Sequence, residues 1–269
     1  ILYRVRGDHI TQQQLALSPP ARGSRAILRS LLAIAIPVSL GTLATTITSF
    51  IDSSSVLNRL KYVMQQDPQA ILKMYPGIQE KATEIPDFIY GAYCYALSIF
   101  NLVPTITTTF AISALPAVTA AWTLRDRVQT RQSVEAVLRI TSLVAFPSGI
   151  GIAVLSKPIL KLLYPSAQRA MGVDIAAPAL SLLGVGVIFV ALLTPINSML
   201  QAVGRADLPV KLMLVGGSIK IVTNFLLVSI PSVNVKGAPV GTILCYIFLF
   251  TASMIFLCRR IDMVPRIRS

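Results

Sequence analysis

Long uncharged runs alternate with short charged segments along this chain. The first run, Ser30 to Ile51, contains 22 residues without a charge, and a helix of that length crosses the hydrocarbon core of a bilayer. Because similar runs follow, we predict an all-α polytopic membrane protein built as a bundle of six transmembrane helices. The spans are expected at about residues 27–55, 88–120, 136–156, 175–203, 211–230 and 238–258.

The charged segments predict how these spans are connected. Residues 1–25 have the composition of a basic linker, and residues 26–260 form the six-helix transmembrane lobe. Residues 61–87 mix acids, bases and three prolines, which predicts short amphipathic helices in an external insertion. Residues 261–269 are expected to be a tail or a link to further helices.

The distribution of lysine and arginine predicts the orientation. The 24 basic residues divide into 15 in the segments placed inside, 8 in those placed outside and one within a span. Since cytoplasmic loops carry the basic excess, both ends of this chain are expected in the cytoplasm and the protein in the plasma membrane.

Polar side chains recur at steps of three and four residues along three of the spans, so each of these helices has a polar face. Such a face lines a polar cavity, or it makes the hydroxyl contacts between helices that membrane bundles also use. We favour the cavity because several side chains stand in line. The residues are Thr42, Thr45, Thr46, Ser49 and Asp52 in the first span, Asn101, Thr105 and Thr108 in the second, and Thr194, Asn197 and Gln201 in the fourth.

Lys220 is the only charge well inside a predicted span, and Asn224 lies one turn beyond it. An intramembrane lysine costs about 3 kcal/mol on insertion scales, so it needs water, a carbonyl or a partner. Snorkelling to an interface is the alternative, but either end of the span is roughly 14 Å away along the helix. We therefore predict that Lys220 faces the cavity.

Asp52 and Arg59 are more ambiguous. Asp52 is interpreted as a proton or cation site, as a partner of Arg59, or as a cap at the end of the span. Arg59 either contacts an anionic substrate at the external mouth or terminates the helix.

The composition excludes several other classes. The chain is 54% hydrophobic and 13% charged, with a mean hydropathy of +0.70, which is typical of polytopic membrane proteins. Its net charge of +13 lies at the ends of apolar runs and forms no continuous basic face, so nucleic acid is not an expected partner. The single histidine, His9, has no Cys or acidic cluster near it. We expect no catalytic residues, no metal, no cofactor and no enzyme activity.

The order and spacing of several short motifs resemble the MOP (multidrug/oligosaccharidyl-lipid/polysaccharide) flippase superfamily, in particular its polysaccharide-transporter branch and stage V sporulation protein B-like proteins. The motifs are Ala35–Ser39, Ile51–Ser53 with Arg59–Leu60, Ile89–Tyr93, Leu115–Val118, Leu200–Arg205 and Lys236–Gly241. Two departures from the family pattern are the insertion between Lys61 and Asp87 and the pair Ala238-Pro239.

The resemblance implies two six-helix lobes around a central cavity, with this chain as the C-terminal lobe. It implies a flippase for lipid-linked oligosaccharide or cell-wall and polysaccharide precursors, working by alternating access. The implied partners are membrane lipids, the lipid-linked sugar and an N-terminal six-helix lobe of the same protein. The alternatives are a cation-coupled multidrug exporter of the same superfamily, which favours acidic and aromatic cavities, and a membrane assembly protein without transport.

The topology is testable with two single cysteines. Residue 129 lies in a predicted cytoplasmic loop and residue 69 in the external insertion. Gln129→Cys and Gln69→Cys should react with an impermeant thiol reagent from opposite sides of the membrane. Labelling of both from the same side would contradict the six-span arrangement.

Overall fold

The computed structural model describes residues 23–25, 28, 32, 50, 53–76, 78, 83–166, 170–230 and 233–261. The chain divides into two compact units, Ile1–Ser39 and Leu40–Ser269, and the helices discussed here belong to the second. Most of the first predicted span lies outside the described residues. The same holds for five predicted cavity residues, which are Thr42, Thr45, Thr46, Ser49 and Asp52.

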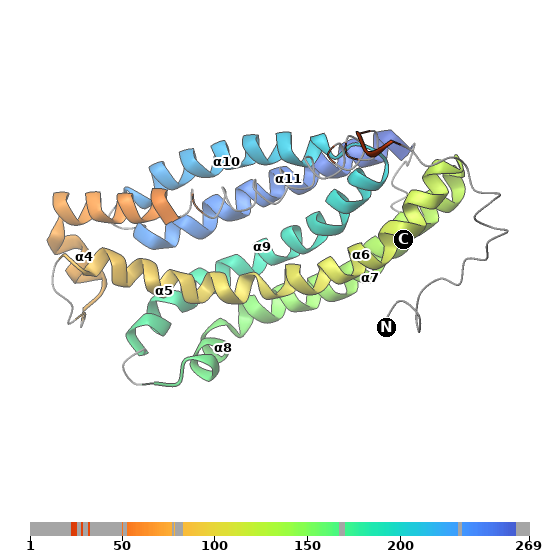
Figure 1. Cartoon of the computed structure of the whole chain (residues 1–269). Coiled ribbons are helices and arrows are strands. Elements are labelled where there is room, and N and C mark those ends of the chain that lie inside the picture. Colours follow the sequence, from red (N-terminus) through yellow and green to blue (C-terminus); the bar gives the residue numbers. More distant parts are fainter. Residues whose placement is uncertain are drawn as a thin grey trace, which may run out of the picture. The chain divides into compact units, whose positions relative to one another are not determined.

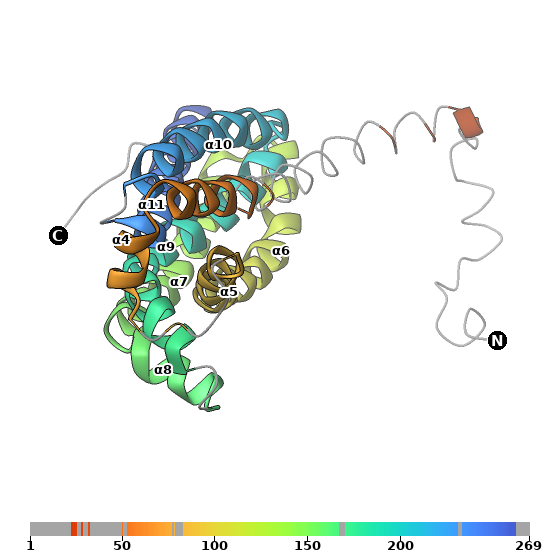
Figure 2. The same cartoon turned by 90° about the vertical axis from the view of Figure 1, so that its left-hand side faces the viewer.

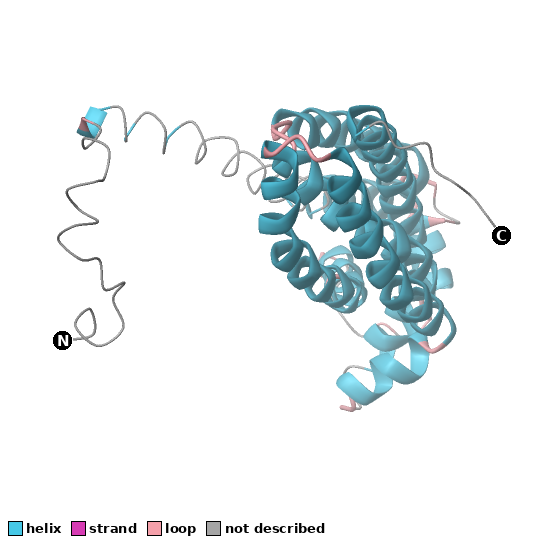
Figure 3. Cartoon of the chain, turned by 90° about the vertical axis from the view of Figure 1, so that its right-hand side faces the viewer, coloured by secondary structure: helices cyan, strands magenta, loops and turns pink. Residues whose placement is uncertain are grey.

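Every regular element in the described part of the chain is a helix, which confirms the all-α class (Figure 3). Residues 53–66 are helical and lead into the labelled elements of Figure 1. These are α4 (Pro68–Met74), α5 (Ile85–Phe100), α6 (Leu102–Thr123), α7 (Arg127–Val154), α8 (Ser156–Leu163), α9 (Ala170–Ala202), α10 (Asp207–Val228), the 3₁₀ helix η2 (Asn234–Lys236) and α11 (Gly237–Ile261).

Five helical stretches within the described ranges are long and apolar enough to cross a membrane, so the protein is a multi-pass membrane protein. Each has a mean hydropathy between 1.4 and 2.4 over an 18-residue window. Large apolar side chains such as Leu143, Ile150 and Val222 are exposed on their outer faces, as expected for contact with lipid. The stretches are Ile85–Thr123, Arg127–Val154, Ala170–Ala202, Asp207–Val228 and Asn234–Ile261.

Helix α9 is the central element of the lobe. It packs against α5, α6, α7, α8 and α11, and the view in Figure 2 places it among them. In its apolar window 67% of the residues are buried, against 33% or less in the other four stretches. A helix that is apolar on all sides must be surrounded by other helices or by lipid. Helix α9 is surrounded mainly by other helices.

The backbones of α7 and α9 come into close contact at two glycines. A Cβ atom on Gly184 would lie 2.6 Å from the Ala153 nitrogen and 2.7 Å from the Gly149 carbonyl oxygen. A Cβ atom on Gly149 would lie 2.8 Å from the Gly184 carbonyl oxygen. The Ser181 hydroxyl donates a hydrogen bond to the Ala153 carbonyl at 2.8 Å across the same contact. Small residues allow the two backbones to approach this closely. Because helices in lipid gain no hydrophobic driving force for association, this close packing and the hydrogen bond stabilise the pair.

The segment around α4 packs onto the same core. Asp67 caps α4 by accepting a hydrogen bond from the Ala70 amide at 3.0 Å, and Pro68 occupies the first turn, where its missing N–H costs nothing. Ile71 and Tyr75 are buried in the cluster that includes residues of α5 and α9, and burial raises the pKa of Tyr75 to about 12. Leu72, by contrast, is exposed.

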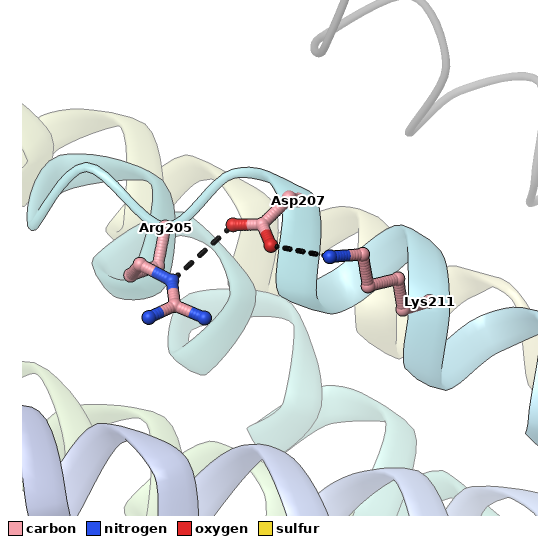
Figure 4. A network of polar contacts seen from close by, with 3 residues as sticks. All are labelled: Arg205, Asp207 and Lys211. Carbon is pink, nitrogen blue, oxygen red and sulfur yellow. Dashed lines mark hydrogen bonds and ion pairs between the residues drawn. The ribbon is translucent and has the colours of Figure 1, made fainter.

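The turn between α9 and α10 is closed by an exposed network of charges (Figure 4). Asp207 lies between the Arg205 Nε, at 3.3 Å, and the Lys211 Nζ, at 2.9 Å. Gly204 has a φ of 78°, a backbone conformation that glycine adopts without strain. Exposed ion pairs contribute about 0–1 kcal/mol each, so these charges stabilise the turn only modestly.

The glycine contact yields a stability prediction. Gly184→Ala forces a methyl group into the α7 backbone, and such overpacking costs roughly 1–3 kcal/mol. Gly151→Ala is the matched control, because no atom lies within 4 Å of a Cβ there and alanine favours the helix by up to about 1 kcal/mol. The free energy of unfolding in detergent micelles, followed by circular dichroism, should fall for Gly184→Ala only. Equal stability of the two variants would contradict the close contact.

Candidate functional site

A polar cavity of about 380 Å³ lies between helices α5, α6, α9, α10 and α11. Four of the polar residues singled out from the sequence line it, and they come from three different predicted spans. They are Asn101, Thr194, Asn197 and Lys220. The remaining lining residues are Tyr90, Leu97, Phe100, Pro104, Val190, Leu193, Met213, Thr242 and Tyr246.

Asn101 reaches the cavity because the chain is interrupted there. It lies between the end of α5 and the start of α6. Its backbone N–H donates to the Leu97 carbonyl at 3.1 Å. Pro104 follows within the first turn of α6 and has no N–H to bond the carbonyl four residues earlier. The proline therefore favours a break in the long apolar stretch, and the break places the asparagine at the cavity.

Two residues in the last third of α9 provide polar groups to the cavity. The Thr194 hydroxyl donates to the Val190 carbonyl of its own helix at 3.0 Å. The Asn197 Oδ1 accepts a hydrogen bond from the Ser253 hydroxyl of α11 at 3.4 Å. Both side chains are half-buried, so they present polar atoms while their helix remains packed.

Lys220 is the charged residue of the cavity lining. Only 3% of its surface is exposed, which argues against a side chain that snorkels to the surface of the lobe. Burial of an ammonium group is costly unless polar groups or water surround it. The amide and hydroxyl groups of the same cavity provide such surroundings.

Asn224 is buried beside the cavity and connects three segments. Its Nδ2 donates a hydrogen bond to the Ser55 hydroxyl at 3.2 Å, which joins α10 to the helical residues 53–66. A Cβ atom on Gly241 would lie 2.5 Å from the Asn224 Oδ1. The glycine of α11 thus leaves space for the amide, and Asn224 is held by packing between helices.

Arg59 contacts α10. Its guanidinium carbon lies 3.3 Å from the centre of the Phe225 ring and 5.2 Å from that of Tyr62. Arginine over an aromatic face gains about 0.5–2 kcal/mol, more when it is desolvated. The helix continues beyond Arg59 to Gln66, so the residue does not terminate it. The stacking fixes the side chain between two helices.

The other predicted residues lie away from the cavity lining. The Thr105 hydroxyl donates to the Asn101 carbonyl at 2.8 Å, and that of Thr108 to the Pro104 carbonyl at 2.8 Å. Gln201 is half-buried in the last turn of α9. Their polar groups occur at the predicted spacing, but the side chains of Thr105 and Thr108 bond to the backbone of their own helix.

Three lining residues with polar groups were missed by the sequence reasoning. Thr242 and Tyr246 are four residues apart on α11, so the helical period that identified the other faces also applies to them. Tyr90 lies on α5. Tyrosine in an apolar run gives little signal by itself, because its ring packs like any other aromatic side chain.

The cavity combines one lysine with amide, hydroxyl and phenol groups. Within the ranges that the structure describes, its lining includes no carboxylate, and no group of three His, Cys, Asp or Glu side chains is placed to hold a metal ion. Such a lining suits a polar molecule with negative charge, which the lysine attracts and the neutral groups hydrogen-bond.

Comparisons with known proteins agree with this architecture. A family model described as lipid II flippase MurJ matches residues 90–267. Among solved structures, the chain is similar to the outward-facing conformation of a multidrug resistance MATE family transporter of the MOP superfamily. The TM-score is 0.60 at 15% identity, over 89% of this chain and 48% of the other. No curated protein matches. The predicted relationship to the MOP superfamily is confirmed, and the chain spans about half the length of the MATE transporter.

Proposed function

This chain belongs to the lipid II flippase MurJ family, and from that premise we propose that it is one lobe of a flippase for a lipid-linked sugar with an anionic headgroup. Such a flippase passes a polar headgroup across the membrane while the lipid chain stays in the bilayer. The headgroup needs a path that replaces water with other polar partners. The lobe would provide half of that path.

The observation that carries the proposal is the position of Lys220 in the polar cavity. The lysine is almost fully buried, yet it shares the lining with Asn101, Thr194 and Asn197. The ammonium group would attract the negative charge of the headgroup, and the side-chain amides would donate hydrogen bonds to its oxygens. Because these groups come from three segments of the chain, rearrangement of the helices would change the affinity, as transport by alternating access requires.

A second lobe would complete the transporter. The chain covers 48% of the MATE transporter to which its fold is similar, which fits one of two lobes. Substrate sites in such two-lobe transporters lie between the repeats. We therefore expect the cavity of this lobe to face a matching surface of an N-terminal lobe.

The cavity's charge favours an anionic substrate over a cationic drug. The likeness to the MATE transporter concerns the fold alone, at 15% identity. A cationic drug would be repelled by Lys220 and would need a carboxylate, which the lining lacks within the described residues.

The proposal also has a topological part. The end of the lobe at which α6, α9 and α11 finish carries Arg125, Arg127, Arg205, Lys211 and Arg260 among the described residues. We place this end in the cytoplasm, in accordance with the positive-inside rule. The opposite end, with α4 and α8, would then be external.

Substitution of Lys220 tests the proposal. In the transporter that contains this lobe, reconstituted in proteoliposomes with a fluorescent lipid-linked sugar, Lys220→Met should lower the flipping rate roughly tenfold or more, since a hydrogen bond to a charged group contributes about 1.5–3 kcal/mol. Lys220→Arg should retain part of the rate, because it keeps the charge with another geometry.

Lys211→Met is the matched control for this experiment. It makes the same change in the same helix, at an exposed residue paired with Asp207, and should flip at the normal rate. If Lys220→Met flips as fast as Lys211→Met while both insert normally, the lysine does not contact the headgroup and the proposal fails.

A further inference from the structure

A second pocket lies at the far end of α6, where α7 begins and α11 ends. Its volume is about 440 Å³, and it is lined by Trp122, Thr123, Arg125, Arg127, Thr130 and Arg260. Trp122 is 21 residues beyond Asn101, or about 30 Å along the helix axis. The pocket is therefore separate from the polar cavity around Lys220.

The turn between α6 and α7 holds an arginine where helices usually place glycine. Arg125 has a φ of 58°, its N–H donates to the Trp122 carbonyl at 3.1 Å, and the Asp126 N–H donates to the Ala121 carbonyl at 3.0 Å. These two bonds define a Schellman motif, in which the left-handed residue is most often glycine. A side chain there costs about 1–2 kcal/mol, and Arg125 takes this position in the lining of the pocket.

Two acids near the pocket have hydrogen-bond partners on α7. Asp126 caps α7 by accepting a hydrogen bond from the Gln129 amide at 2.9 Å. Glu135 accepts one from the Arg131 Nε at 2.8 Å. The Arg260 guanidinium lies 5.4 Å from the centre of the Trp122 ring, a cation–π contact that orients it. Arg125, Arg127 and Arg260 line one small space, and the lining includes no carboxylate within the described part of the chain.

We propose that this pocket binds a phosphate group, supplied by the headgroup of an anionic phospholipid. Guanidinium groups match phosphate oxygens with paired hydrogen bonds. The Thr123 and Thr130 hydroxyls in the same lining donate to backbone carbonyls, so the arginines are the donors for the phosphate. The pocket is at the end of membrane-spanning helices, the level at which tryptophan, arginine and lipid phosphates occur. Basic pockets between such helices are suited to anionic headgroups.

The surroundings of the pocket also fit a lipid. Leu124 is 79% exposed and Val128 is 67% exposed, and both lie in the segment that carries Arg125 and Arg127. Apolar side chains next to a phosphate site would contact the acyl chains of the same molecule. A free phosphate ion would use the arginines but gain nothing from these two residues.

Trp122 is the only tryptophan of the chain and therefore reports on the pocket directly. The 269-residue chain in neutral detergent is titrated with dioctanoyl phosphatidylglycerol, with dioctanoyl phosphatidylcholine and with inorganic phosphate, and the fluorescence of Trp122 is followed. We expect a saturable change with phosphatidylglycerol at a concentration well below that needed for phosphatidylcholine, and a midpoint that rises with salt.

The three titrations distinguish a phospholipid headgroup from a free phosphate ion as the source of the phosphate group. Competition of inorganic phosphate with phosphatidylglycerol means that the free ion occupies the same site, and a response to phosphatidylglycerol alone means that the lipid is required. Both outcomes support a phosphate site. Identical titrations with the two lipids, or no response to either phosphatidylglycerol or phosphate, would overturn it.

Two variants and a matched control connect the signal with the pocket. Arg260→Gln and Arg125→Gly should each raise the phosphatidylglycerol midpoint about fivefold. Glycine at 125 also relieves the left-handed backbone, so the turn is kept when the side chain is removed. Arg259→Gln removes the same charge from the same turn of α11 without touching the lining and should shift the midpoint less than about twofold. An equal shift of the midpoint for Arg259→Gln and Arg260→Gln would assign the effect to the charge of the whole surface. That result would refute the proposal that this pocket binds the phosphate group.

Discussion

The burial of α9 among its neighbours is the constraint on which the rest of the lobe depends. Helices in lipid gain little from hydrophobic contact, so their association requires close packing and hydrogen bonds. The contact of Gly149 and Gly184 allows α7 to approach α9 at backbone distance, and the Ser181 hydroxyl adds a bond across it. Once α9 is fixed in this way, Thr194 and Asn197 acquire defined positions at the cavity.

The polar residues of the lobe fall into two groups with different surroundings. One group is bonded between helices, as in the contacts of Asn224 with Ser55 and of Asn197 with Ser253. The other lines the polar cavity, and it includes Lys220 and Asn101; Asn197 belongs to both groups. Thr105 and Thr108 show a third arrangement, in which the hydroxyl bonds to the backbone of its own helical segment. A polar group within a membrane needs one of these partners, because lipid offers no hydrogen bonds. The division explains why a polar stripe in the sequence does not by itself indicate a cavity.

Much of this architecture can be predicted from the sequence, and the predictions that failed did so for physical reasons. Uncharged runs predicted an all-α membrane protein, and five long apolar helices among the described residues confirm that class, because length and apolarity are the main signals of a membrane-spanning helix. Helical periodicity selected Asn101, Thr194 and Asn197, and an isolated charge within a span selected Lys220. The structure brings these four residues to one cavity; their part in substrate binding stays a prediction. Periodicity cannot show that Thr105 bonds its own backbone or that Arg59 stacks on Phe225, since these outcomes depend on rotamers and on distant segments.

The most direct test of the account is whether the cavity around Lys220 contains water in the membrane. In a background without Cys94, Cys245 and Cys258, single cysteines are placed at Asn197 and Thr194, which line the cavity, and at Leu143, which is exposed on the outer face of α7. A hydrophilic thiol reagent applied to the reconstituted protein should label the first two and not the third, because a thiol surrounded by lipid does not ionise. Labelling at Leu143→Cys with none at Asn197→Cys and Thr194→Cys would contradict a polar cavity in this lobe.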